Sequence, residues 1–439
     1  GTGAARFETA ATTGTTGTGA GAKGGAQGGA EWAARARAAA GAAVRAAFDS
    51  RAASAASWVQ PSLAIVTTTL GFEQAVLLGL QDVLPGVPVI GGSAADDAVL
   101  ESSLQFVASG NTSRSPHAGS APGAYGRNPS PSGPGGGGMG ADTELVGAGV
   151  VVTLLWPTVR TSLTFASAYR PLETAAGKVT KASADGRTLH EIDHRPAADV
   201  YAEWARSPDL AAAAKQAAAL APGSLPGSAS GAAFEGGGGR RVPILEASTM
   251  HPLARIVRPP APTPQADSRS ALRAWAQSIR LGGGGGDGDG GGGGERDFYS
   301  LVHPQAMGEG GALELLAPVE EGSDIACMSA TVDELDLHIG KVLETTDDPA
   351  TENGGPRTGG GGVGGNDRAS LGALVVYCGG CALALKRGGK LANFPERVSG
   401  ALGHAPFLAL FTYGELGTDA FGSNRHADLM YTILRFQTD

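Results

Sequence analysis

The sequence predicts an α/β protein of the α+β, mixed-sheet type, with two related lobes of buried mixed sheets flanked by helices. Two observations support this. Uncharged β-branched runs without polar alternation, at residues 62–69 and 371–377, are typical of strands covered on both faces. Between such runs lie segments with apolar residues at helical spacing. Low-complexity stretches rich in Gly, Ala and Pro interrupt both lobes, and we expect them to be disordered.

The N-terminal half begins with the strand at 62–69. A helix is expected at 72–84, because Val76, Leu80 and Val83 share one face and Pro85 ends it. A second short strand covers 87–90. Strands at 103–107 and 145–155 then form a hairpin around an inserted loop. The remaining expected elements are short strands at 161–169, 178–180 and 189–192 and a helix that begins at Pro196.

The C-terminal half is more fragmented. Its expected strands lie at 242–245, 256–257, 298–302, 312–316, 324–329, 371–377, 407–412 and 429–436. Thr331 and Glu334 form a capping-box pattern that starts a helix, and a second helix at 391–402 is weakened by Pro395. The order strand, helix, strand, strand occurs in both halves, which predicts two related units; the first half's third strand would be residues 104–107.

These patterns divide the chain into three segments. Residues 1–55 form a low-complexity segment in which an Ala/Arg-rich stretch, 31–48, is expected to be an exposed helix. An N-terminal domain covers 56–206, with an insertion at 108–141. A C-terminal domain covers 207–439, and its insertions lie at 222–241, 282–295 and 351–369. Removing such stretches leaves about 290 residues, enough for two domains of ~150 residues each.

Charge, cysteine content and hydropathy exclude several classes of protein. The 33 Lys and Arg against 42 Asp and Glu give a net charge of −9, and no basic block is present, so we expect no nucleic-acid partner. Three cysteines cannot form a multi-bridge secreted framework and favour a reducing compartment. The apolar run at 145–159 is too short to span a membrane. We therefore expect a cytoplasmic protein without a membrane partner; the Thr/Ala-rich, acid-poor start leaves organelle import as a weaker alternative.

Polar or Gly-rich clusters follow several predicted strands, where α/β sheets generally bind ligands. The first contains Gly91, Gly92, Ser93, Asp96 and Asp97. Its paired glycines allow close backbone approach, and its two carboxylates could take an ammonium group or a metal ion. A simple turn followed by a helix cap is the alternative interpretation.

The second cluster contains Cys378, Gly379, Gly380 and Cys381, directly after a strand. A thiol at a helix N-terminus has a lowered pKa, so the pair could be a redox dithiol, or Cys378 a nucleophile with His426 as its base and Glu415 or Asn424 as orienting group. Half of a zinc site is a weaker reading, because a second Cys-x-x-Cys is absent. Core packing or the lining of a pocket is the more ordinary interpretation.

Two further clusters bracket a short loop before the last strand. One is Tyr413, Gly414 and Glu415, and the other is Asn424, Arg425 and His426. The guanidinium of Arg425 suits a ligand carboxylate, or it could pair with Asp419 or Asp428 on the surface.

Taken in order, these blocks resemble the FIST domain. LVVYCGGC from Leu374, TYGELG from Thr412 and NRHADLM from Asn424 look like its C-terminal half. PVIGGSAADD from Pro88 and GAGVVV from Gly147 resemble its N-terminal half, so that the likeness covers about residues 58–439. The Gly-rich insertions are foreign to that pattern, and Pro395 interrupts a helix that it would make continuous.

The resemblance implies an intracellular sensory module. It would bind a small ligand, such as an amino acid or similar metabolite, and pass the signal to a signalling or ubiquitin-ligase-type protein partner. We expect the ligand carboxylate at Arg425 and the amides of the paired glycines, and its ammonium group at Asp96, Asp97 or Glu415. No catalytic residue, metal or cofactor is expected. A thiol-dependent enzyme and a protein-interaction scaffold remain the alternatives.

Overall fold

The computed structural model describes residues 2–6, 26–49, 59–94, 105–108, 143–146, 149–220, 241–258, 279–283, 297–345 and 369–438. Asp96 and Asp97 lie outside these residues, as does nearly all of each predicted insertion. Within the described part, mixed sheets and helices confirm the predicted mixed α/β class.

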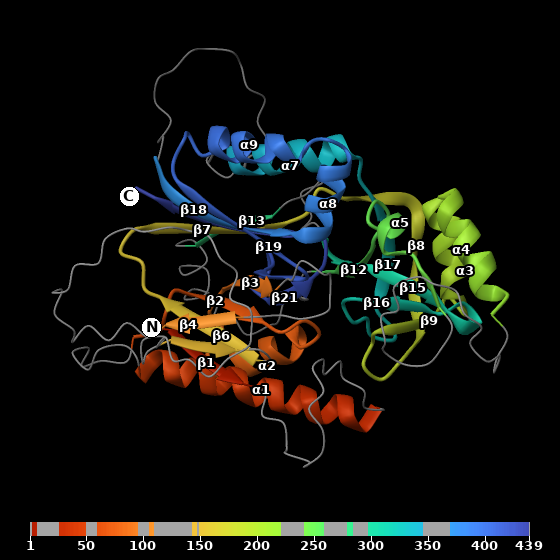
Figure 1. The fold of residues 1–439 in the computed structure, drawn as a ribbon, viewed down its shortest axis with the longest axis horizontal. Helices are drawn as coiled ribbons and strands as arrows, with labels where there is room; N and C mark the ends of the chain where they lie inside the picture. Colours follow the sequence, from red (N-terminus) through yellow and green to blue (C-terminus); the bar gives the residue numbers. More distant parts are fainter. Residues whose placement is uncertain are drawn as a thin grey trace, which may run out of the picture.

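Two sheets stack face to face between two layers of helices (Figure 1). The first sheet has the strand order β1 (Thr2–Arg6), β6 (Gly149–Leu155), β2 (Leu63–Thr68), β3 (Val89–Ser93), β20 (Glu415–Thr418) and β21 (Asn424–Ala427). The second has the order β13 (Ile279–Gly283), β7 (Arg160–Ala166), β22 (Tyr431–Gln437), β18 (Ser370–Cys378) and β19 (Phe407–Thr412). Leu63, Ile90, Leu163, Val376 and Leu434 fill the space between them.

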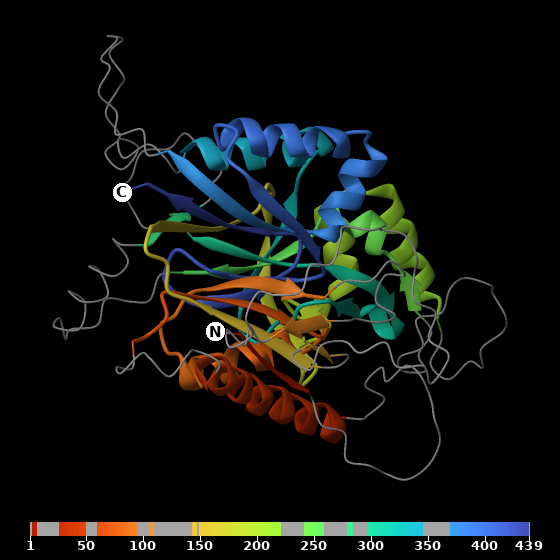
Figure 2. The same ribbon diagram turned by 60° about the vertical axis from the view of Figure 1, so that its left-hand side comes forward.

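Helices cover the outer face of each sheet. α1 (Ala26–Asp49) and α2 (Glu73–Val83) cover the first sheet. α7 (Val332–Thr345), α8 (Gly379–Arg387) and α9 (Phe394–Ala401) cover the second, α9 continuing from a 3-10 turn at Leu391–Asn393. Figure 2 shows the resulting order of helix, sheet, sheet and helix layers.

A third sheet lies beside this sandwich, on the right in Figure 1. Its order is β11 (Arg241–Pro243), β15 (Pro304–Gly308), β16 (Leu313–Leu315), β9 (Thr188–Ile192), β8 (Arg170–Ala182), β17 (Asp324–Ser329), β12 (Leu253–Val257) and β14 (Phe298–Val302), with β10 (Arg195–Pro196) paired to β9. α3 (Ala197–Ala205), α4 (Pro208–Ala218) and α5 (Leu245–Ser248) accompany it. The predicted hairpin around the first insertion is present as β4 (Gln105–Ala108) and β5 (Thr143–Val146).

The two related units predicted from the sequence are visible in the strand pairing. β2 and β3 are parallel and joined through α2, while β18 and β19 are parallel and joined through α8 and α9. Each first strand has an antiparallel neighbour on its other side, β6 in one unit and β22 in the other. The third strand of the first unit is therefore β6, not the predicted 104–107, which pairs with β5 instead.

The helix near the N-terminus is not exposed as predicted. Ala36, Ala40, Ala43 and Ala47 of α1 are fully buried in the core between α1, α2 and the first sheet. Close packing of the two helices is possible because Gly79 lies opposite Arg37, where a Cβ would come within 2.2 Å of the Arg37 carbonyl oxygen. The alanine-rich composition thus indicates tight helix packing here, not a solvated tail.

Each of the three large sheets contains strands from both sides of residue 206.

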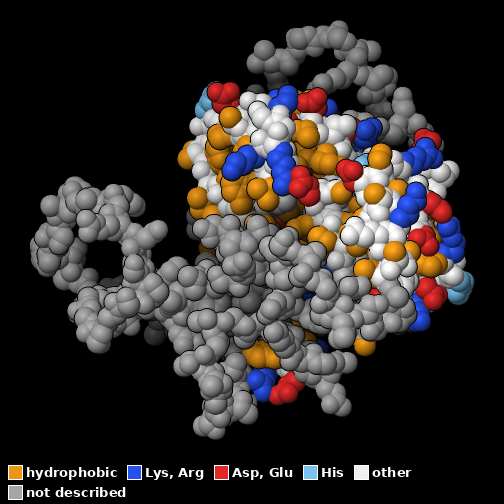
Figure 3. Space-filling view, turned by 45° about the vertical axis from the view of Figure 1, so that its right-hand side comes forward, with side chains coloured by type: hydrophobic (Ala, Val, Ile, Leu, Met, Phe, Trp, Pro, Cys, Tyr) orange, Lys and Arg blue, Asp and Glu red, His pale blue; other side chains and the backbone are white. Residues whose placement is uncertain are grey.

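On the face shown in Figure 3, the Lys and Arg side chains are interspersed with Asp and Glu. None of the helices among the described residues is long and apolar enough to cross a membrane.

Candidate functional site

The first predicted cluster lies in a strand, not in the turn expected after it. Gly91, Gly92 and Ser93 are the last three residues of β3, because that strand continues far enough to pair with β20. Gly91 has a φ of +153°, and a Cβ there would lie 1.7 Å from the carbonyl oxygen of Val66. Only glycine allows β2 and β3 to approach in this way.

The turn between β19 and β20 meets the end of β3. The backbone N–H of Ser93 donates to the carbonyl of Gly414 at 3.0 Å, and that of Tyr413 donates to Ser93 at 3.4 Å. A Cβ on Gly92 would lie 2.7 Å from Thr412, so the second glycine of the pair is required by this close approach. Two of the clusters predicted from sequence are therefore in direct contact.

A buried carboxylate at the start of α2 is bound to the end of β3. The Ser93 hydroxyl donates to Glu73 Oε1, and the Gly71 N–H donates to the same oxygen at 2.8 Å. The Arg187 guanidinium lies 3.5 Å from Glu73 Oε2. Burial alone would raise the pKa of Glu73, but the charge of Arg187 and the two hydrogen-bond donors act against it, and the net shift of the pKa is downward. Glu73 is therefore a buried anion.

His426, in β21, is near enough to this carboxylate to interact with its charge. Its side chain is 1% exposed, and neither ring nitrogen has a hydrogen-bond partner among the described residues. Asp428 Oδ1 is the nearest acidic atom, 3.6 Å from His426 Nε2, which is too long for a hydrogen bond. Burial lowers the pKa of His426 to about 4, so the ring is neutral at pH 7. An unsatisfied buried polar group costs about 1–3 kcal/mol.

Asp428 and Glu415 are also buried, yet their ionisation differs from that of Glu73. Burial raises the pKa of Asp428 to about 7, although the His303 N–H donates to its Oδ2 at 2.9 Å. Burial and the nearby Cys378 raise the pKa of Glu415 well above its usual range. A carboxyl group with a raised pKa is a poor ion-pair partner for an ammonium group, so Glu73, whose pKa is lowered, is better suited to the role predicted for Glu415.

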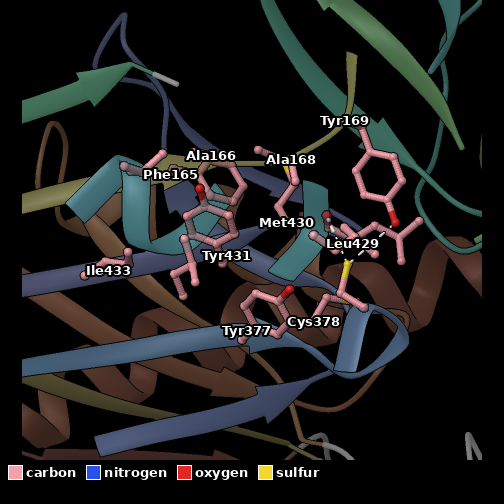
Figure 4. Close-up of a cluster of buried hydrophobic side chains, with 14 of the residues drawn as sticks. Phe165, Ala166, Ala168, Tyr169, Tyr377, Cys378, Leu429, Met430, Tyr431 and Ile433 are labelled. Atoms are coloured by element: carbon pink, nitrogen blue, oxygen red, sulfur yellow. Dashed lines mark hydrogen bonds between the residues drawn. The ribbon is translucent and has the colours of Figure 1, made fainter. Parts of the chain in front are cut away.

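The two cysteines belong to an apolar core with several tyrosines. Figure 4 shows the Tyr169 ring directed toward Leu429, with Tyr377 and Cys378 close by. Cys381 Sγ lies 3.7 Å from the Tyr169 hydroxyl and 3.6 Å from the Leu429 carbonyl. A hydrogen bond with Cys381, together with burial, raises the pKa of Cys378 well above its usual value. The lowered thiol pKa expected from the helix N-terminus is therefore wrong for Cys378.

Gly379 and Gly380 allow this core to close. A Cβ on Gly379 would lie 2.9 Å from the Tyr413 ring, and one on Gly380 would lie 2.9 Å from Leu429. The glycines of the second cluster thus pack against the third cluster and the segment just before β22. The described residues show no hydrogen bond between Cys378 and His426, so the suggested nucleophile and base are not paired here.

Asn424 and Arg425 lie toward the other end of the β20–β21 hairpin. The Asn424 amide donates to the Val87 carbonyl at 2.8 Å and accepts from Thr418 at 2.7 Å. Arg425 Nε donates to the carboxylate of Asp419, which is fully buried. The ion pair with Asp419 that the sequence offered as an alternative is thus present, and it occupies part of the guanidinium.

Sequence reasoning missed four residues of this junction: Glu73, Arg187, Arg255 and Asp428. Asp428 lies two residues after His426, and Glu73 follows a strand and a glycine, so both carried a local signal. Arg187 and Arg255 belong to the third sheet or its turns, and no spacing in the sequence links them to β3 or β21.

The structure brings no three His, Cys, Asp or Glu residues into a metal-binding arrangement within its described part.

Comparison with known families agrees with the resemblance in the C-terminal half. The model of the FIST C domain matches residues 252–418, a segment that contains Cys378, Cys381, Tyr413 and Glu415. The likeness of the N-terminal half to the same domain type is not confirmed by a family model and stays a prediction. No curated protein matches the chain.

Proposed function

Because this chain contains a FIST C domain at residues 252–418, we propose that it is a sensory module for a small, ammonium-bearing metabolite of the amino-acid type. The ligand would bind at the junction formed by Glu73, Ser93, Arg187, His426 and Asp428, which we call the His426 cluster. The observation that supports the proposal is the buried imidazole of His426, which lacks hydrogen-bond partners among the described residues and lies beside two acidic groups.

The chemistry of the cluster fits an ammonium group. Such a group donates up to three hydrogen bonds, and the cluster offers the Glu73 anion, the Asp428 carboxyl and the acceptor nitrogen of a neutral His426. A bound cation would also favour the ionised form of Asp428, because an opposite charge at short range lowers the pKa of a carboxyl group. Binding would then release a proton near pH 7.

The position of the cluster supports a role in passing on a signal. Glu73 and Ser93 belong to the first sheet and its helix, while Arg187 lies between β8 and β9 of the third sheet and also donates to Leu316 and to Gly71. A ligand held there would contact groups from two sheets, so its presence could bias their relative position. A signalling or ubiquitin-ligase-type protein partner would read that change.

A binding screen of the full chain tests the proposal. Thermal unfolding is measured with each of the twenty L-amino acids, simple amines and organic acids, and calorimetry follows each shift. A ligand at a hundred times its Kd stabilises by about 2.7 kcal/mol, which is a shift of a few degrees.

A matched pair of variants locates the site. His426→Gln should weaken binding at least tenfold, because it changes the central acceptor, while His190→Gln in β9 should bind like the wild type. The absence of any shift, or equal affinity in the His426→Gln variant, would contradict the proposal.

A further inference from the structure

We propose that Arg255 forms the anion-binding end of the same site and takes the carboxylate of a zwitterionic ligand. This inference rests on the proposed function and specifies its ligand class. It concerns a residue of the third sheet that no motif in the sequence singles out.

Arg255 lies in β12, paired in register with Ser300 of β14. Two hydrogen bonds made by one of its side-chain nitrogens fix the position of the guanidinium. Nη2 donates to the Ser300 hydroxyl at 2.8 Å and to the backbone carbonyl of His426 at 2.9 Å. Nε is buried and has no hydrogen-bond partner among the described residues. A guanidinium carries five N–H donors, so much of its capacity is unused.

Arg255 also has no carboxylate partner within the described part of the chain, unlike the arginines around it. Arg187 pairs with Glu73, and Arg425 pairs with Asp419. Burial and the nearby positive charge of Arg425 lower the pKa of Arg255 to about 10, which Asp428 and Glu320 offset only in part. A buried, unpaired guanidinium is unfavourable, and a carboxylate, which it can bind through two parallel hydrogen bonds, would remove that cost.

The two ends of the proposed site meet at one residue. The carbonyl of His426 is bound by Arg255, whereas the ring of His426 lies beside Asp428 and is affected by the charge of Glu73. The guanidinium of Arg255, which can bind an anion, and the groups that can bind a cation, Glu73 and Asp428, are therefore separated by little more than the side chain of His426. A compact zwitterion, with its carboxylate and ammonium groups on the same carbon, matches this arrangement.

The test compares each L-amino acid with its α-carboxamide, which keeps the ammonium group and lacks the carboxylate. Calorimetry is carried out on the full chain with wild type, Arg255→Gln and Arg255→Lys, and with Arg258→Gln as control, because Arg258 follows the same strand but is exposed and pairs with Asp324. The comparison on wild type alone needs no variant, so it stands even if a substitution prevents folding.

The wild type should bind the acid at least tenfold more tightly than the amide. Arg255→Gln should lose ten- to a hundredfold in affinity for the acid and little for the amide, with Arg255→Lys in between because it lacks the planar fork. Equal affinity for acid and amide in the wild type would overturn the anion site and leave the proposed function intact, as would an unchanged Arg255→Gln variant.

One result would support the anion site and refute the amino-acid ligand. If acetate stabilises the wild type but not Arg255→Gln, and no amino acid or amine binds, the anion site stands and the amino-acid ligand is refuted. If amino acids, amides and acetate all fail to bind, both proposals are refuted.

Discussion

Three buried carboxyl groups of one junction ionise differently because the charges around them differ. Glu73 accepts from Gly71 and Ser93 and faces Arg187, so it keeps its charge. Glu415 accepts from Thr412 and Met430 but lies against Cys378, and Asp428 accepts from the backbone of His303. Burial is similar for all three; the donors and charges around each group decide the outcome.

Asp428 should make the protein less stable as the pH rises. Its pKa of about 7 is above the ordinary value of 3.8, so between these values the folded state binds more protons than the unfolded state, and the free energy of unfolding falls as pH increases. His426 acts in the opposite direction between about pH 6.5 and 4. We expect urea unfolding to show that the free energy of unfolding of Asp428→Asn, relative to that of the wild type, rises by a few kcal/mol between pH 4 and pH 8. Each unit of pKa shift corresponds to ~1.4 kcal/mol. Parallel pH profiles for the two proteins would contradict this.

The thiols of Cys327 and Cys378 should be unreactive in the folded protein. Burial raises the pKa of Cys327 to about 12, and Cys378 is shifted in the same direction by Cys381 and burial, so little thiolate is present at pH 7.5. Iodoacetamide labelling, followed by mass spectrometry, should be at least a hundredfold slower than in urea for both residues. Rapid labelling of Cys378 in the native protein would instead support the thiol-enzyme alternative.

Among the elements, those with a local signal were predicted well. The capping box at the start of α7 is present, with the Thr331 N–H bound to Glu334 at 2.7 Å and the Glu334 N–H bound to Thr331 at 3.2 Å. β2, α2, β9, α3, β14, β17 and β19 lie close to their predicted positions. Pro395 does not weaken α9, because it occupies the first turn, where a missing N–H costs nothing.

The elements that were missed are defined by long-range contacts. β20 and β21 are short and rich in Gly and polar residues. They form strands because β20 pairs with the edge of β3 and β21 pairs with β20. α1 was predicted to be exposed from its Ala- and Arg-rich composition, whereas its alanines pack against Val76, Leu77 and Leu80 of α2, and the two helices approach closely at Gly79. The same difference between local and long-range signals applies to the candidate site. Glycines and acidic residues at strand ends were predicted, but arginines from a separate sheet were not.

The contact between α1 and α2 should not tolerate a side chain at residue 79. Gly79→Ala would place a methyl group against the Arg37 carbonyl, so we expect a loss of about 1–3 kcal/mol in the free energy of unfolding. Gly41→Ala, in the middle of α1, meets its nearest atom only at 3.5 Å and should stabilise by about 0.5–1 kcal/mol through helix propensity. Equal effects of the two substitutions in urea unfolding would show that the helices are not closely packed.

At the scale of the whole molecule, the predicted boundary at residue 206 does not separate the sheets. β20 and β21 complete a sheet begun by β2 and β3, and β22 lies between β7 and β18. The His426 cluster likewise combines residues from both sides of that boundary, since Glu73, Ser93 and Arg187 precede it and His426 and Asp428 follow it.

Fragments cut at this boundary should therefore not fold alone. Residues 1–206 and 207–439, expressed separately, should lack a cooperative thermal transition, because each sheet would lose strands to the other fragment. Co-expression of the two should restore a complex with such a transition. A cooperative transition of residues 207–439 alone would show instead that the FIST C segment is an independent unit.

The pairing of β3 with β20 has a consequence for synthesis of the protein. The N–H of Val89 is bound to the Thr418 hydroxyl, 329 residues later in the chain. At about 5–20 residues per second, the ribosome needs roughly 16–65 seconds to make the intervening segment. For that time the nascent chain carries an open apolar strand edge, which is a site for pairing with other chains. Shelter by chaperones, not the strength of the final contacts, should then limit the yield of folded protein.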